Sequence, residues 1–150
     1  MIVFADTSAL GSLYLGDEVD GSWIAAVVLD GHDPVAICEV ADVELANLLV
    51  RARRDGRIDA SGVAERLDAY RHHTADDGPI GVVPVTKDTL VRARSIVSQA
   101  PVRTLDAIHL AAAQILAETS DDVVVLLTRD SRQAIAAADV GFTLYEAPER

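Results

Sequence analysis

Two acidic residues follow short apolar runs of the chain, near the points where predicted strands end. Asp6 comes immediately after the run Ile2–Ala5, and Asp130 comes three residues after the end of the run Val123–Leu127. Both runs have the length and composition of buried strands. Because sites in open parallel sheets lie beyond the carboxyl ends of the strands, Asp6 and Asp130 are candidates for one shared site.

Two further acids stand near the start of segments with helical periodicity. Glu44 lies early in the predicted helix Val40–Arg54, and Asp106 lies early in the predicted helix Leu105–Glu118. Helices that follow strands in a fold of this kind begin at the same edge of the sheet. We therefore expect four acids that are far apart in the sequence to lie together, namely Asp6, Glu44, Asp106 and Asp130.

Carboxylates that meet in one place repel one another, and each loses part of its solvation. A divalent cation relieves both penalties, and a site of oxygen ligands selects Mg²⁺ or Mn²⁺ over zinc. The chain has no set of Cys and His with the spacing of zinc ligands. Such an ion activates a water and neutralises charge that grows on a phosphate, which favours phosphodiester hydrolysis. The number of metal ions stays open.

Each acid also has a purely structural interpretation. The segment 130–133 (DSRQ) resembles a helix capping box, with Gln133 at its N3 position. Asp106 in a first helical turn is favoured by the helix dipole without any catalysis. For Glu44 alone, a position that faces solvent is favoured. The joint placement of the acids therefore supports the metal site, and no single residue does.

The elements that must position these acids alternate along the chain. Apolar runs predict strands at Ile2–Ala5, Val35–Cys38, Ile80–Val85, Val123–Leu127 and Phe142–Tyr145. Helical patterns predict helices at Ser8–Leu15, Val19–Leu29, Val40–Arg54, Ile58–His73, Asp88–Gln99, Leu105–Glu118 and Asp130–Ala138. The expected N-caps include Asp59 or Ser61, and Thr104. The alternation predicts an α/β fold, one domain over residues 1–150, with a parallel sheet covered on both faces.

Net charge limits the ligands that the protein would bind. The chain has 150 residues and a formal net charge of −11, which argues against a general nucleic-acid binder. An acidic protein that acts on RNA needs cations or a local basic patch. The densest basic cluster includes Arg51, Arg54 and Arg57, which would contact RNA phosphates. Arginines also suit a solvated helix C-terminus, and that alternative stays open.

The single cysteine, Cys38, excludes a disulfide framework and fits a reducing cytoplasm. No apolar run approaches the length that crosses a membrane. The N-terminal residues have neither the basic nor the long apolar region of a signal peptide. We therefore expect a cytoplasmic protein with no membrane contact.

Several polar residues next to the acids are candidates for supporting roles. Ser8 and Thr128 would orient an acid or a water by hydrogen bonding, with helix capping as the alternative. For Thr7, capping and turn chemistry are favoured. His109 lies three residues after Asp106 on the same predicted helix face. A packed or supporting histidine is favoured there over a general base.

Four segments have the order and spacing of a known set of motifs: VFADTSAL at 3–10, CEVADVEL at 38–45, RTLDAIHLAAA at 103–113 and LTRDSR at 127–132. The set resembles the PIN-domain family, and in particular its branch of VapC-like toxins. The first segment is similar to the family's hydrophobic strand followed by Asp, Thr or Ser, Ser and Ala. The third is the most specific. The second departs from many relatives, which have Ser or Thr where Ala41 or Asp42 stands.

The resemblance implies a three-layer α/β/α fold with a central parallel sheet of about five strands. It implies a Mg²⁺- or Mn²⁺-dependent endoribonuclease that hydrolyses RNA phosphodiester bonds with a metal-activated water, often in transfer or ribosomal RNA. The family's acids map onto Asp6, Glu44, Asp106 and Asp130. The resemblance also implies a homodimer and a cognate antitoxin, which inserts a segment, often with an arginine, into the acidic site.

Other protein classes share parts of this pattern. A phosphatase of similar fold needs a second Asp two residues after the first, where Ser8 stands. A receiver domain needs paired acids after its first strand and an Asp after its third, and the chain offers only Asp6 and Asp88. A PIN-like interaction module with an acidic groove that does not cleave stays open as the alternative to the toxin ribonuclease.

Overall fold

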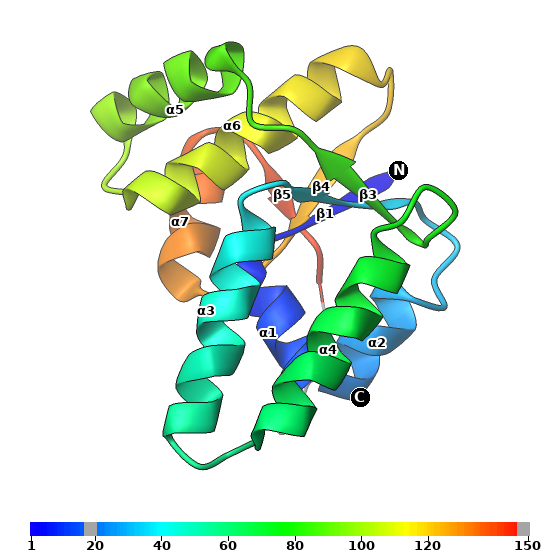
Figure 1. Cartoon of the computed structure of the whole chain (residues 1–150). Coiled ribbons are helices and arrows are strands. Elements are labelled where there is room, and N and C mark those ends of the chain that lie inside the picture. Colours follow the sequence, from blue (N-terminus) through cyan, green and yellow to red (C-terminus); the bar gives the residue numbers. More distant parts are fainter. Residues whose placement is uncertain (17–20, 147–150) are drawn as a thin grey trace.

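A five-stranded parallel sheet organises the molecule (Figure 1). The computed structural model describes residues 1–16 and 21–146. The strands are β1 (Ile2–Ala5), β2 (Val35–Cys38), β3 (Ile80–Val83), β4 (Val124–Leu127) and β5 (Thr143–Leu144). Their spatial order is β3-β2-β1-β4-β5, and all four pairings are parallel. The prediction of an α/β fold with a parallel sheet of about five strands is confirmed.

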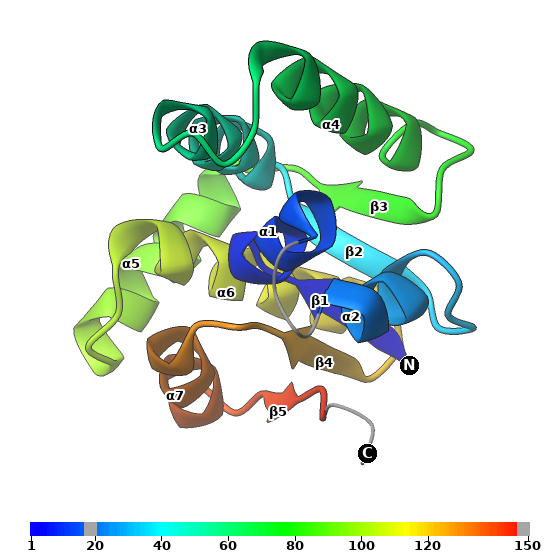
Figure 2. The same ribbon diagram turned by 90° about the horizontal axis from the view of Figure 1, so that it is seen from below.

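Helices cover both faces of this sheet (Figures 1 and 2). They are α1 (Thr7–Leu15), α2 (Gly21–Val28), α3 (Ala41–Arg54), α4 (Ala60–His73), α5 (Lys87–Gln99), α6 (Thr104–Thr119) and α7 (Ser131–Asp139). Helices α1 to α4 pack on one face, where they share an apolar core with the sheet. Helices α5 to α7 pack on the other face and form a second core with it. These are the three layers that the family resemblance implies.

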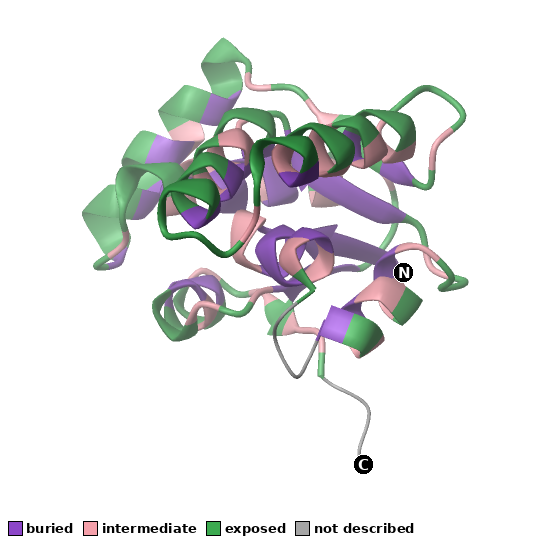
Figure 3. Ribbon diagram, turned by 60° about the horizontal axis from the view of Figure 1, so that its bottom comes forward, coloured by how far each residue is buried: buried purple, intermediate pink, exposed green. Residues whose placement is uncertain are grey.

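Strand side chains alternate between the two cores, as the period of a β-strand requires. In β1, Val3 and Ala5 belong to the core under α1 to α4, whereas Ile2 and Phe4 belong to the core under α5 to α7. Every residue of β1, β2 and β4 is buried, and Figure 3 shows these strands as a buried layer between helices with exposed outer faces. Burial on both faces explains why these strands are apolar throughout.

The register of the central strands brings their carboxyl ends together. Ala5 of β1 pairs with Leu127 of β4 and with Ile37 of β2. Beyond this register the backbone N–H of Asp6 still donates to the carbonyl of Leu127, at 3.1 Å. The loop after β1 and the loop after β4 are thus held against each other at one edge of the sheet.

Most element boundaries agree with the sequence to within two residues, and the differences have local causes. Strand β3 ends at Val83, earlier than predicted, because Pro84 has no N–H for the ladder. Asp59 caps α4 by accepting from the N–H of Gly62 at 2.7 Å. The prediction that Thr104 caps α6 is wrong: Arg103 is the N-cap, and its side chain makes no capping hydrogen bond. In the predicted helix Val19–Leu29, residues 19 and 20 lie outside the described residues.

In the part of the chain that the structure describes, no helix is both long enough and apolar enough to span a membrane.

Candidate active site

A cavity of about 210 Å³ lies at the carboxyl edge of the sheet. All four acids predicted from the sequence line it: Asp6, Glu44, Asp106 and Asp130. They come from four different places, namely the ends of β1 and β4 and the first turns of α3 and α6. The cavity wall is completed by Thr7, Ser8, Leu48, Arg51, Arg103 and His109.

Asp6 is held more firmly than the other acids. It is buried, caps α1, and its Oδ1 accepts from the N–H of Ala9 at 3.0 Å and from Ser8 Oγ at 2.6 Å. Its Oδ2 accepts from Thr128 Oγ1 at 2.5 Å. Ser8 Oγ in turn accepts from the N–H of Arg129 at 2.7 Å, which fastens α1 to the loop after β4. Ser8 and Thr128, the two residues expected to orient an acid, therefore both bond to Asp6.

Glu44 is held through one oxygen. Its Oε2 accepts from Thr7 Oγ1 at 2.6 Å and lies 2.6 Å from Nε2 of His109. Thr7, for which the sequence favoured a capping role, instead donates a hydrogen bond to Glu44, one of the four acids of the site. No hydrogen bond from a described residue reaches Oε1 of Glu44, so this oxygen is the one available to a ligand.

Asp106 and Asp130 are less constrained. No hydrogen bond from a described residue reaches the carboxylate of Asp106, which is half-buried. Asp130 caps α7, because its Oδ1 accepts from the N–H groups of Arg132 at 2.8 Å and Gln133 at 3.4 Å. The reciprocal half of the predicted capping box is absent, since the Gln133 side chain donates to the Asp106 carbonyl at 3.4 Å. Gln133 thus ties α7, which carries one acid, to the first turn of α6, which carries another.

Electrostatics differ among the acids. Burial raises the pKa of Asp6, and the hydrogen bonds from Ser8 and Thr128 offset this in part. Burial also raises the pKa of Asp106, and repulsion from Asp130 and Asp6 adds to the rise. Burial acts in the same direction on Glu44, but the bonds from His109 and Thr7 outweigh it and lower its pKa. The protein alone thus disfavours the anions of Asp6 and Asp106, and a cation would relieve that penalty.

The donor set fits a hard cation with few protein ligands. In this cavity, the carboxylate oxygens that accept no hydrogen bond from a described residue belong to Glu44, Asp106 and Asp130. The imidazole of His109, which also lines the cavity, has its Nε2 engaged by Glu44. Among the described residues, no three His, Cys, Asp or Glu side chains come close enough to enclose a metal ion. A set of oxygen donors of this kind suits Mg²⁺ or Mn²⁺, which keep several waters and use one or two carboxylates, better than a closed zinc-type cage.

The family model for the PIN domain matches residues 3–139, which include all four acids. The chain belongs to the PIN-domain family. Among curated proteins, it is 28% identical over 145 residues to ribonuclease VapC47 of Mycobacterium tuberculosis (strain CDC 1551 / Oshkosh), covering 94% of this chain and 93% of that protein.

Solved structures share the fold of this PIN domain. VapC20 of M. tuberculosis, a toxin that cleaves the sarcin–ricin loop, matches with a TM-score of 0.68 at 16% identity, covering 96% of this chain and 98% of that one. A toxin–antitoxin complex from Klebsiella pneumoniae matches with a TM-score of 0.60 at 17% identity, covering 99% of both chains.

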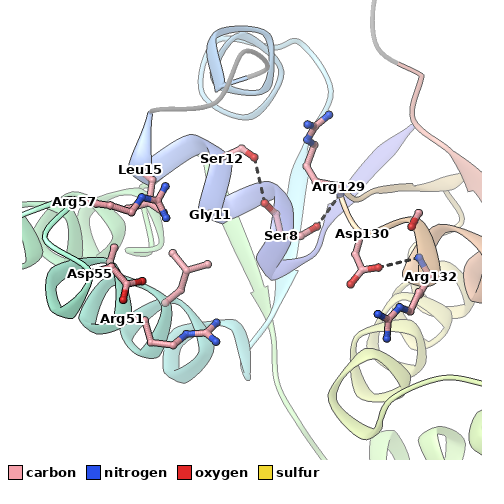
Figure 4. Close-up of a pocket in the computed structure, with 13 residues that line it drawn as sticks. Ser8, Gly11, Ser12, Leu15, Arg51, Asp55, Arg57, Arg129, Asp130 and Arg132 are labelled. Atoms are coloured by element: carbon pink, nitrogen blue, oxygen red, sulfur yellow. Dashed lines mark hydrogen bonds between the residues drawn. The ribbon is translucent and has the colours of Figure 1, made fainter.

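An arginine-lined groove of about 670 Å³ adjoins the acidic cavity of this PIN domain and shares Ser8, Leu48, Arg51 and Asp130 with it. Figure 4 shows Arg51 and Arg57 on the α3 side of the groove and Arg132 on the α7 side. Arg129 also lines it. Of the three arginines predicted to contact RNA, Arg51 and Arg57 lie here, whereas Arg54 is exposed on α3 and lines neither cavity.

A third hollow adjoins both the acidic cavity and the groove. It measures about 280 Å³ and shares Arg103 and Asp106 with the acidic cavity and Arg132 with the groove. Three arginines of these cavities were not predicted from the sequence as site residues: Arg103, Arg129 and Arg132. A signal existed, because each of them stands within three positions of one of the predicted acids. An acid that serves a phosphate ligand is expected to have basic residues close by.

Proposed function

We propose that this PIN domain is a Mg²⁺- or Mn²⁺-dependent endoribonuclease and the toxin of a toxin–antitoxin pair. The observation that supports this most is the convergence of Asp6, Glu44, Asp106 and Asp130 in one cavity. Similarity to a VapC ribonuclease and to structures of VapC-type toxins supports the same assignment. The proposed ligands and catalytic residues are these four acids.

The four acids would hold the cation together, one or two of them directly and the others through its waters. A divalent ion in this cavity supplies the charge that activates a water and stabilises the phosphate. Asp6, fixed by Ser8, Ala9 and Thr128, offers a rigid carboxylate that needs little further ordering. Asp106 and Asp130 keep oxygens that are not hydrogen-bonded and can adjust to the ion and the substrate.

The groove beside the acids would hold the RNA backbone. A protein with a formal net charge of −11 needs local positive charge to approach phosphates. Arg51, at the junction of groove and acidic cavity, is placed to contact the phosphate nearest the acids. Arg57, further along the groove, would contact a neighbouring phosphate. A contact from Arg54 stays a prediction from the sequence.

A protein partner is part of the same proposal. The acidic cavity would accept an arginine of a cognate antitoxin, which would block the ligand positions of the cation. The resemblance of the fold to a chain of a toxin–antitoxin complex supports such a partner. A homodimer is likewise proposed, and light scattering of the purified protein tests it.

The test is cleavage of total cellular RNA by antitoxin-free protein in Mg²⁺, in Mn²⁺ and in EDTA. Asp106→Asn removes one proposed ligand, and Asp139→Asn is the matched control, because Asp139 is exposed at the far end of α7. We expect discrete fragments with either metal, from the unaltered protein and from Asp139→Asn, and none in EDTA or from Asp106→Asn. Equal cleavage by Asp106→Asn, or cleavage that survives EDTA, would contradict the proposal.

The alternative is a PIN-like interaction module that does not cleave. The observation that favours it is that, among the described residues, no group of three or more His, Cys, Asp or Glu side chains is arranged to hold a metal ion. The module would bind its protein partner with unchanged affinity in EDTA and would cleave no RNA in either metal. The same experiment, with an antitoxin-binding assay added, separates the two functions.

A further inference from the structure

A buried histidine beside the acids has polar contacts with two residues of the cavity. His109 on α6 has 1% of its surface exposed. Its Nε2 lies 2.6 Å from Oε2 of Glu44 on α3 and 3.2 Å from Oγ1 of Thr7 on α1. Thr7 donates to the same oxygen of Glu44 at 2.6 Å. Two donors from two helices therefore converge on one carboxylate oxygen of a third helix.

The hydrogen-bonding role of the ring follows from its partner. A carboxylate only accepts hydrogen bonds, so Nε2 of His109 is the donor to Glu44. Nδ1 is buried, and no described residue forms a hydrogen bond with it.

The unpaired Nδ1 indicates that packing alone does not explain a histidine at this position. A buried polar atom without a partner destabilises a fold, so an apolar side chain would suit this position better if packing alone mattered. The contacts favour a supporting role over that of a general base, because Nε2 is engaged by Glu44 and only 1% of the residue is exposed. The favourable polar interaction of the ring is the hydrogen bond from Nε2 to Glu44.

We propose that His109 and Thr7 are positioning residues that fix Oε2 of Glu44 and thereby present Oε1 to the cation. The inference rests on the proposed metal-dependent function. Glu44 has a long side chain and is partly exposed, so without these bonds its carboxylate would sample several rotamers. The ordering of Glu44 would then have to accompany metal binding and would weaken it. Hydrogen-bonding partners of ligating carboxylates typically change metal affinity by about 10–100-fold.

Amide substitutions test the position of the donor. In His109→Gln the side-chain amide nitrogen stands about where Nε2 stood, whereas in His109→Asn it is shorter and stands near Nδ1. His109→Leu removes the donor and keeps the bulk. Thr7→Val and Thr7→Ser form a second pair, in which only Ser retains the hydroxyl. His32→Asn is the matched control, since His32 is exposed in the loop before β2, at the opposite edge of the sheet.

The measurement is Mn²⁺ affinity by calorimetry on the full chain, with the thermal unfolding midpoint in EDTA as a check on folding. We expect the Kd for Mn²⁺ to rise about 10–100-fold in His109→Asn, His109→Leu and Thr7→Val. His109→Gln, Thr7→Ser and His32→Asn should stay within a few-fold of the unaltered protein. A merely structural role would lower the unfolding midpoint without this separation between Gln and Asn.

Two results would overturn the inference in different ways. Unchanged Mn²⁺ affinity in folded His109→Leu and in Thr7→Val would overturn the positioning role and leave the proposed nuclease intact. If His109 variants do not fold, the two Thr7 variants decide the question, because Thr7 is only partly buried. No Mn²⁺ binding by the unaltered protein would overturn the proposed metal-dependent function, and this inference with it.

Discussion

Thr128 donates a hydrogen bond to Oδ2 of Asp6 across 122 positions of sequence. The contact exists because Ala5 of β1 pairs with Leu127 of β4, so the residue after each strand meets the other at the sheet edge. Thr128 Oγ1 also accepts from the N–H of Asp130, at 3.1 Å. One hydroxyl therefore connects the first and the fourth acid of the site.

Thr128→Val should weaken both the site and the fold. It removes a donor to a buried carboxylate, which costs about 1.5–3 kcal/mol, and leaves the N–H of Asp130 without this acceptor. We expect an unfolding free energy lower by about 2 kcal/mol in urea, and metal affinity lower by about 10–100-fold. Thr128→Ser keeps the hydroxyl and is the control. If Val and Ser behave alike, the hydroxyl does not hold Asp6.

Asp6→Asn should lower stability while it abolishes cleavage. The two oxygens of Asp6 together accept three hydrogen bonds, from Ser8, Ala9 and Thr128. An amide offers only one acceptor, so its NH₂ group must face one of these donors. The loss is about 2 kcal/mol, or roughly 4–8 °C in the unfolding midpoint in EDTA. An unfolding midpoint equal to that of the unaltered protein would show that the carboxylate is dispensable for folding.

Asp106→Asn should have the opposite effect on stability in EDTA. The raised pKa of Asp106 means that folding favours its neutral form. The stability from that form is complete below the ordinary pKa of 3.8 and is lost as the pH rises through the raised value. At neutral pH, Asn removes the repulsion from Asp130 and Asp6. Because Asp106 is partly exposed, we expect a gain of only about 0.5 kcal/mol or less.

The pH dependence isolates this effect. Urea unfolding in EDTA should give Asp106→Asn and the unaltered protein the same stability at acid pH, and a difference that grows toward neutral pH. Addition of Mg²⁺ should reverse the order, because only the unaltered protein keeps the full ligand set. Cleavage should fall at least 100-fold, beyond the effect of losing an outer partner. If Asp106→Asn is less stable than the unaltered protein at pH 7 in EDTA, repulsion of Asp106 by Asp130 and Asp6 does not destabilise the fold.

The sequence was sufficient to predict the convergence of the acids but not their partners. Asp6 and Asp130 follow apolar strands, and the edge rule for parallel sheets then places both at one site. The pairing of β1 with both β2 and β4 depends on packing between distant segments, and no local pattern encodes it. The bond from Thr7 to Glu44 depends likewise on where α1 and α3 meet.

The helix N-caps show where residue preferences predict a helix start and where they do not. An Asp directly before a helix is an N-cap signal, and Asp6 fulfils it by accepting from the N–H of Ala9. That role was readable from the sequence and was missed, because the acid was considered only as a site residue. At α6 the preference of Thr for N-caps predicted Thr104 as the cap, but the helix begins at Thr104 and its N-cap is Arg103. Arg103 precedes the helix there, beside Asp106, in the hollow next to the acids.

The groove predicts different roles for neighbouring arginines. RNA binding is measured by fluorescence anisotropy over a series of salt concentrations, in the background of Asp106→Asn to prevent cleavage. Arg51→Ala and Arg57→Ala each remove a side chain that lines the groove. We expect each to weaken binding and to reduce the salt slope by about one phosphate contact, a change of about 0.7 for single-stranded RNA. Arg53→Ala is the matched control, because Arg53 is exposed on the same helix and does not line the groove. An equal loss in all three variants would mean that a diffuse basic surface, and not the groove, attracts the RNA. No loss in Arg51→Ala would place the RNA elsewhere on the molecule.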